Sequence, residues 1–84
     1  MDCYVFTIID NSGELMRTMA FTTKEKAISA ALQDYDEIYQ ETLAMGSSDF
    51  PNKSEEIKNA LMENEYYELE EHYCYYEINF CKIQ

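Results

Sequence analysis

The sequence predicts one small α+β domain over residues 1–84, in which a three-stranded antiparallel sheet carries two helices on one face, in the order β-β-α-α-β. Two observations support this fold class. Apolar side chains alternate with a period of two near both ends of the chain, and they follow a helical period between residues 23 and 63. The 84 residues suffice for one small core but are too few for a second domain.

The first two strands are expected to form a hairpin. Residues 3–10 have β-branched and aromatic side chains on both faces, which is typical of a central strand. Residues 10–13 predict a turn, in which Gly13 supplies the positive φ of a bulged hairpin. Residues 14–21 then return as the second strand, because apolar side chains alternate there again.

The first helix is expected at about residues 23–45. Thr22 and Glu25 have the spacing of a capping box, and Gly46 is a natural stop signal. One apolar stripe follows the helical spacing and should face the core: Ile28, Ala31, Leu32, Tyr35, Ile38 and Tyr39.

A second helix is expected to begin near Glu55 and to extend at least to Glu63. No glycine or proline interrupts residues 64–72, so the sequence leaves open whether this segment continues the helix or forms a loop. The last segment, residues 73–84, has the alternation of a strand, and we expect it to pair with the first strand.

Charge is the feature of the composition that bears most on function. The chain has 17 acids and 6 bases, a net charge of −11 at pH 7, and residues 34–77 contain no base except Lys53 and Lys58. Direct binding to nucleic acid or to an anionic membrane is therefore disfavoured, and a basic protein partner is favoured. The N-terminal residues lack the basic region of a secretory signal, and no apolar run is long enough to span a membrane, so we expect a cytoplasmic protein.

Rows of carboxylates are the first candidate site. Asp34, Glu37 and Glu41 have the i, i+3, i+7 spacing that places them on one stripe of the first helix, roughly 4.5–6 Å apart along its axis. Phosphates follow one another about every 3.4 Å on a DNA strand, so basic side chains that bind phosphates would find acceptors at a spacing of the same order. The later carboxylates expected to contribute are Glu63, Glu65, Glu68, Glu70 and Glu71. The alternative interpretation is a solvated helix surface that keeps the protein soluble.

Tyrosines are the second candidate, and Tyr66, Tyr67 and Tyr73 are the ones we assign to the site. Consecutive tyrosines cannot all point inward, because neighbouring residues face different ways on a helix or a strand. Exposed tyrosine beside carboxylates is typical of surfaces that bind arginine through cation–π contacts and salt bridges. The alternative is a second small core beneath an extended second helix. Tyr35 and Tyr39 lie on the apolar stripe and are expected in the core.

Metal binding and catalysis are not expected. Cys3, Cys74, Cys81 and His72 are the side chains that could hold Zn²⁺, but no CxxC pair is present, and an odd number of cysteines fits free thiols in a reducing compartment. One histidine, without a glycine-rich phosphate loop or a nucleophile motif, gives no catalytic constellation. We therefore predict no cofactor and no enzymatic activity.

In size and charge the chain resembles the small acidic proteins that bacteriophages encode against host defence, anti-CRISPR proteins among them. The acids of residues 34–71 and the tyrosine-rich stretch 66–76 carry this resemblance. It implies a protein of the bacterial cytoplasm that occupies the nucleic-acid site of a host enzyme, often a CRISPR effector nuclease, without catalysing a reaction.

Two functional hypotheses follow from the sequence. The first is a stoichiometric inhibitor that mimics DNA or RNA and binds a basic nucleic-acid channel, with an antitoxin against a ribonuclease as a variant. The alternative is a structural or regulatory module that associates with itself through a sheet edge or its tyrosines. The sequence leaves monomer and homodimer open.

Overall fold

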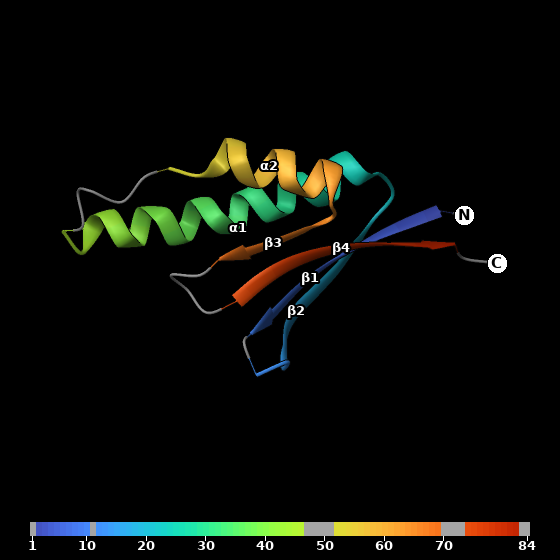
Figure 1. The fold of residues 1–84 in the computed structure, drawn as a ribbon, viewed down its shortest axis with the longest axis horizontal. Helices are drawn as coiled ribbons and strands as arrows, with labels where there is room; N and C mark the ends of the chain where they lie inside the picture. Colours follow the sequence, from blue (N-terminus) through green and yellow to red (C-terminus); the bar gives the residue numbers. More distant parts are fainter. Residues whose placement is uncertain (1, 11, 47–51, 70–73, 83–84) are drawn as a thin grey trace.

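The computed structural model describes residues 2–10, 12–46, 52–69 and 74–82, and it shows an α+β fold with both helices on one side of an antiparallel sheet (Figure 1). The elements are β1 (Asp2–Asp10), β2 (Leu15–Phe21), α1 (Lys24–Ala44), α2 (Ser54–Glu63), β3 (Tyr66–Leu69) and β4 (Cys74–Lys82). The predicted fold class and both helices are confirmed, whereas the predicted number of strands is wrong, because these described residues form a sheet of four.

The strands are arranged in the order β2-β1-β4-β3. β1 pairs with β4 along its whole length, from Asp2 opposite Lys82 to Asp10 opposite Cys74. The prediction that the last strand pairs with the first is therefore confirmed. β2 and β3 are the two edge strands, and β1 is central, as its apolar residues on both faces predicted.

The additional strand, β3, occupies the segment for which the sequence left helix and loop open. α2 ends at Glu63, and Glu65 has a φ of 59°, a left-handed conformation that a helix cannot contain. The Glu65 carbonyl accepts a 2.9 Å hydrogen bond from the Ile78 N–H, which starts the pairing of β3 with β4. Pairing with β4, the next strand along the chain, therefore decides the conformation of this segment, and its two tyrosines are compatible with a strand.

The ends of α1 lie close to their predicted positions. The N-cap is Thr23, whose hydroxyl accepts a 3.2 Å hydrogen bond from the Lys26 N–H, so the predicted capping box at Thr22 is wrong by one residue. Gly46 follows the helix with a φ of +95°, and its N–H donates to the Leu43 carbonyl, as expected for a glycine stop.

The core lies between the helices and the sheet. Its buried side chains come from all three packed parts of the fold: Phe6 and Ile8 of β1, Ala27, Ile28, Ala31 and Tyr35 of α1, Ile57 and Leu61 of α2, and Leu69, Cys74, Tyr76 and Ile78 of β3 and β4. The predicted apolar stripe of α1 is thus confirmed at its centre, and Tyr39 packs partly against this core. None of the described helices covers the other face of the sheet (Figure 1), and we call it the open face.

Candidate partner-binding site

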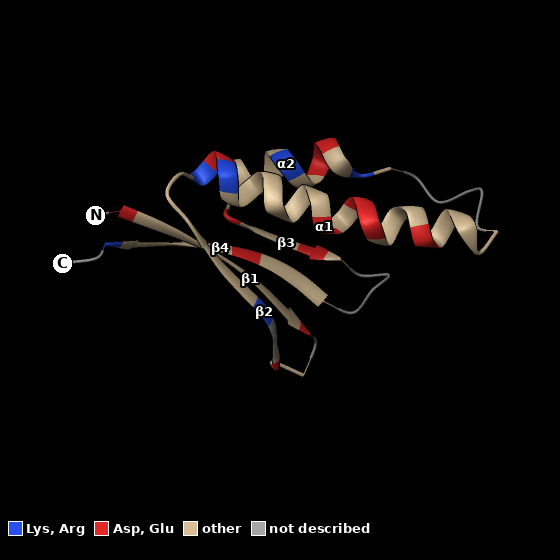
Figure 2. Cartoon of the chain, turned by 180° about the vertical axis from the view of Figure 1, so that it is seen from behind, with Lys and Arg blue, Asp and Glu red and all other residues tan. Residues whose placement is uncertain are grey.

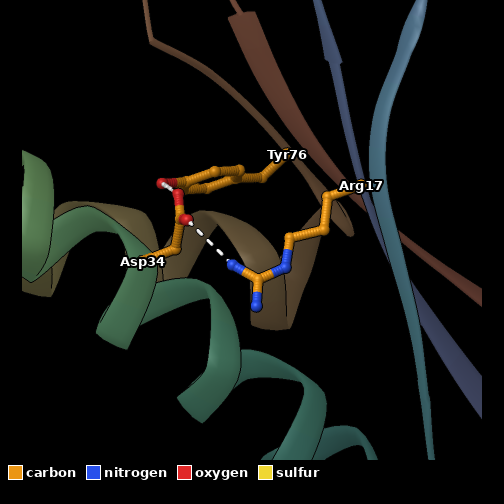
Figure 3. A network of polar contacts seen from close by, with 3 residues as sticks. All are labelled: Arg17, Asp34 and Tyr76. Atoms are coloured by element: carbon orange, nitrogen blue, oxygen red, sulfur yellow. Dashed lines mark hydrogen bonds and ion pairs between the residues drawn. The ribbon is translucent and has the colours of Figure 1, made fainter.

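Asp34, the first member of the predicted acidic stripe, is part of the protein's internal packing. Its carboxylate accepts a 2.6 Å hydrogen bond from the Tyr76 hydroxyl, and its other oxygen lies 3.7 Å from an Arg17 guanidinium nitrogen (Figure 3). The side chain of Asp34 is only 18% exposed. Asp34 therefore joins α1 to β4 and β2, and its charge is directed toward the sheet.

The environment of Asp34 also affects two buried groups of β4. Burial raises the pKa of the Tyr76 hydroxyl far above its usual value, and the hydrogen bond to Asp34 raises it further. Burial likewise raises the pKa of the Cys74 thiol, with smaller contributions from the carboxylates of Asp34 and Asp10. At neutral pH both groups are therefore protonated, and neither is available as an anionic ligand or nucleophile.

The rest of the stripe on α1 is exposed. Glu37 and Glu41 follow Asp34 at helical spacing, and Glu37 borders a shallow depression together with Arg17 and Met19 of β2. Figure 2 shows that acids are concentrated in the C-terminal half of α1, whereas Lys24 and Lys26 lie at its N-terminal end. This arrangement opposes the helix dipole, which favours acids at the N-terminus and bases at the C-terminus.

A second group of acids lies on α2. Glu55 and Glu56 occupy its first turn and are exposed, and Glu63 is exposed at its end. The Tyr67 hydroxyl donates a 2.8 Å hydrogen bond to Glu56, which joins β3 to the first turn of α2. Tyr67 therefore packs on the helix side of the sheet, against the core of the fold. The alternative of a second core beneath an extended second helix is wrong, because α2 ends at Glu63 and Tyr67 lies in β3.

Tyr66 and Glu68 lie on the opposite side of the sheet from Tyr67. Their cross-strand partners are Glu77 and Tyr75, so the four side chains form one patch on the open face, which we call the Tyr–Glu cluster. The Tyr66 and Tyr75 rings have centroids 5.2 Å apart with an interplanar angle of 42°. Partial desolvation raises the pKa of Tyr66, and the nearby charges of Glu68, Tyr75 and Glu77 add to this shift.

The structure therefore divides the residues that the sequence grouped into one site. Glu37 and Glu41 lie on the exposed side of α1, Glu63 lies at the end of α2, and Tyr66 and Glu68 lie on the open face. The remaining assigned residues have other positions: Asp34 and Tyr67 are engaged inside the fold, Glu65 is half-buried at the turn into β3, and Glu70, Glu71 and Tyr73 are outside the described residues.

Sequence reasoning missed Tyr75 and Glu77 as members of a site. The strand alternation expected for the last segment is present, and Cys74, Tyr76 and Ile78 are buried on the core side of β4. The side chains between them had to lie on the other face. Without β3 as a neighbour, however, nothing in the sequence placed them beside Tyr66 and Glu68.

Within the described ranges, no group of three or more histidine, cysteine or acidic side chains is arranged to hold a metal ion. Cys3 and Cys81 are direct cross-strand partners, and Cys74 is buried on the other face of β4. None of the described helices is long and apolar enough to cross a membrane. Comparisons with protein-family models, with curated proteins and with solved structures find no match to this chain.

Proposed function

We propose that the protein is a non-enzymatic acidic inhibitor that acts in the cytoplasm of a bacterial host and occupies a basic nucleic-acid-binding channel of a host enzyme, such as a CRISPR effector nuclease. The exposed carboxylates of the helices stand in for phosphates, so the partner's arginine and lysine side chains bind them. Glu37, Glu41 and Glu63 are the predicted site residues that supply this contact, and Glu55 is a further exposed carboxylate, in the first turn of α2.

The observation that carries this proposal is the charge distribution along α1. The first turn contains Glu25 together with Lys24 and Lys26, the last turn contains no base, and Glu41 lies near the negative end of the helix dipole. A carboxylate in that position destabilises a helix by about 0.3–1 kcal/mol relative to a cation. A surface evolved only for solubility would mix both signs and would place them to favour the dipole. The arrangement is more consistent with selection for binding a cation.

The test begins with capture of a partner from a bacterial lysate on the immobilised protein, elution by a salt gradient and identification by mass. The captured protein is then purified, and its affinity is measured with and without its nucleic acid. We expect the nucleic acid to compete with the acidic protein, and the affinity to fall at least about tenfold between ~0.05 and ~0.5 M NaCl, because salt screens exposed charges. An affinity that does not change with salt, or simultaneous binding of the nucleic acid, would contradict the proposal.

A pair of variants separates function from stability. Glu41→Lys should raise the free energy of unfolding by about 0.5 kcal/mol, because it places a cation at the C-terminal end of α1, yet it should weaken partner binding about tenfold. Glu14→Lys reverses a charge of the same kind on the exposed β1–β2 turn and should leave binding nearly unchanged. If both variants weaken binding equally, net charge and not the helix surface is responsible.

A second candidate function is self-association, and β2 favours it. β2 is an edge strand with one side unpaired within the described sheet, and Leu15 at its start is 56% exposed. Such an edge can pair with the same strand of a second copy. Sedimentation at several protein concentrations distinguishes the two candidates, since a monomer at every concentration would exclude an assembly of this kind.

A further inference from the structure

The Tyr–Glu cluster combines two aromatic rings with two carboxylates in an alternating arrangement. Tyr66 lies opposite Glu77, and Glu68 lies opposite Tyr75, so each ring has a carboxylate beside it on the neighbouring strand. Directly opposed side chains in a sheet have Cβ atoms about 4.5–5.5 Å apart. Tyr66 is 44% exposed and Glu68 is exposed, while Tyr75 and Glu77 are half-buried, so the patch is accessible and partly desolvated.

Neutral side chains border the cluster on the side of β1. The β1 partners of Glu77 and Tyr75 are Thr7 and Ile9, which cannot balance a negative charge. The ion pair between Arg17 and Asp34 lies on the helix side of the sheet, away from the cluster. Among the described residues, no ion pair involves Glu68 or Glu77, so the cluster presents two negative charges next to aromatic faces and is complementary to a cation.

The backbone of β3 adds a second recognition element. Because Glu65 and Ile78 form a hydrogen-bonded pair, the alternation of an antiparallel ladder directs the N–H and C=O groups of Tyr67 toward β4 and those of Tyr66 and Glu68 toward the outer edge. The two residues that contribute side chains to the cluster from β3 thus also direct their backbone groups outward. An extended segment that pairs with this edge would place alternate side chains over the open face.

From this geometry we propose that the Tyr–Glu cluster binds an arginine side chain on an extended segment of a basic partner that pairs with the outer edge of β3. The planar guanidinium stacks on the Tyr66 or Tyr75 ring and donates hydrogen bonds to Glu68 and Glu77, a combination that the compact ammonium of lysine cannot reproduce. This inference shares with the proposed function only the assumption of a basic partner, and it names a different surface, on the side of the sheet away from the helices.

The test uses the purified protein and synthetic peptides, so it does not depend on capture of the host enzyme. The first probe is a seven-residue peptide of alternating valine and threonine with one central arginine, and the matched probes carry lysine or the neutral analogue citrulline. We expect the arginine peptide to shift the NMR signals of β3 and of Tyr75, and to bind at least about fivefold more tightly than either matched peptide.

Three variants locate the binding. Tyr66→Leu keeps the bulk of the side chain but removes the aromatic face, and Glu77→Gln removes a charge while keeping the shape, so each should weaken the arginine peptide at least about fivefold. Glu14→Gln removes one charge from the exposed β1–β2 turn and should leave the affinity unchanged. Circular dichroism and the unfolding midpoint show whether each variant remains folded.

Three outcomes would overturn the inference: no binding at millimolar peptide, equal binding of the arginine and lysine peptides, or equal weakening by Glu14→Gln and Glu77→Gln. Failure of the peptide test would leave the helix-mediated inhibitor proposal intact, because that proposal depends on Glu37 and Glu41. Conversely, a partner whose affinity does not change with salt would contradict the inhibitor proposal without affecting a positive peptide result.

Discussion

Replacing Asp34 with alanine should destabilise the protein strongly, although Asp34 was assigned from the sequence to a binding surface. In the structure its carboxylate is the acceptor for the Tyr76 hydroxyl, at 2.6 Å, and Tyr76 is completely buried. The substitution leaves that hydroxyl without its acceptor in the interior. It also leaves Arg17 without its ion-pair partner.

The two losses differ in size. A hydrogen bond to a charged group contributes about 1.5–3 kcal/mol, and a buried donor that loses its acceptor costs about 1–3 kcal/mol. The ion pair contributes much less, because the Arg17 side chain is 55% exposed and the separation is 3.7 Å, and exposed pairs contribute about 0–1 kcal/mol. We therefore expect Asp34→Ala to lower the free energy of unfolding by about 3 kcal/mol, which for a domain of this size lowers Tm by about 15 °C.

Urea unfolding at pH 7, followed by circular dichroism, measures these effects. Asp34→Asn keeps an acceptor and should lose about 1 kcal/mol, and Arg17→Met should lose less than about 0.5 kcal/mol. Tyr76→Phe in the Asp34→Ala background should restore part of the stability, because no unsatisfied hydroxyl remains. If Arg17→Met costs as much as Asp34→Ala, or if Asp34→Ala costs less than about 1 kcal/mol, the hydrogen bond to Tyr76 does not have the role described.

Three further predictions concern pH, thiol reactivity and helix capping. Folding raises the pKa of Tyr76, so the folded state holds this proton more tightly than the unfolded chain does. The associated stability is complete below about pH 10 and is lost as the pH rises further. Measurement of the free energy of unfolding at increasing alkaline pH should show this decline, and Tyr76→Phe should make the decline smaller. The exposed Cys81 should react with an aromatic disulfide reagent within minutes at pH 8, whereas Cys74, buried and with a raised pKa, should react only as fast as the protein unfolds; equally fast reaction of both would refute its burial. Thr23→Ala should cost about 1 kcal/mol in urea unfolding while Thr22→Ala costs less than about 0.5 kcal/mol, and the reverse order would place the N-cap of α1 at Thr22.

The two proposed contacts lie on opposite sides of the molecule, and this separation has a consequence for binding. A partner that met both the helix acids and the Tyr–Glu cluster would have to reach from Glu37, which lies beside Arg17 and Met19 of β2, to β3 at the other edge of the sheet. Two weak contacts joined in one partner bind far more tightly than either alone. A substitution at Glu41 or at Glu77 should therefore weaken binding of such a partner by a larger factor than Glu77→Gln weakens binding of the arginine peptide.

Local sequence signals predicted the parts of the fold that depend on neighbours along the chain. The helical period of the apolar residues located α1 to within a residue at each end, and Gly46 was correctly identified as its stop signal. The apolar residues on both faces of the first strand predicted that β1 is central, and the alternation of the last segment predicted that β4 is a strand. Such signals work because a helix or a strand repeats its side-chain directions over a few residues, whatever it packs against.

The strand at Tyr66–Leu69 could not be predicted in the same way. It has only four residues, too few for a clear alternation, and it is a strand because β4, the next strand along the chain, offers it hydrogen-bond partners. The same pairing separates Tyr66 from Tyr67, which the sequence had assigned to one surface, and brings Tyr66 beside Tyr75.

By itself the sequence determined the α+β class, the two helices, the pairing of the first and last strands and the excess of negative charge. The tertiary structure alone decided which charges are available to a partner. Asp34 is one helical turn from Glu37, yet it is directed to a buried tyrosine 42 residues later in the chain, while Glu37 is exposed. The physical reason is that exposure and charge compensation depend on groups brought together by packing, and periodicity along the chain carries no information about those groups.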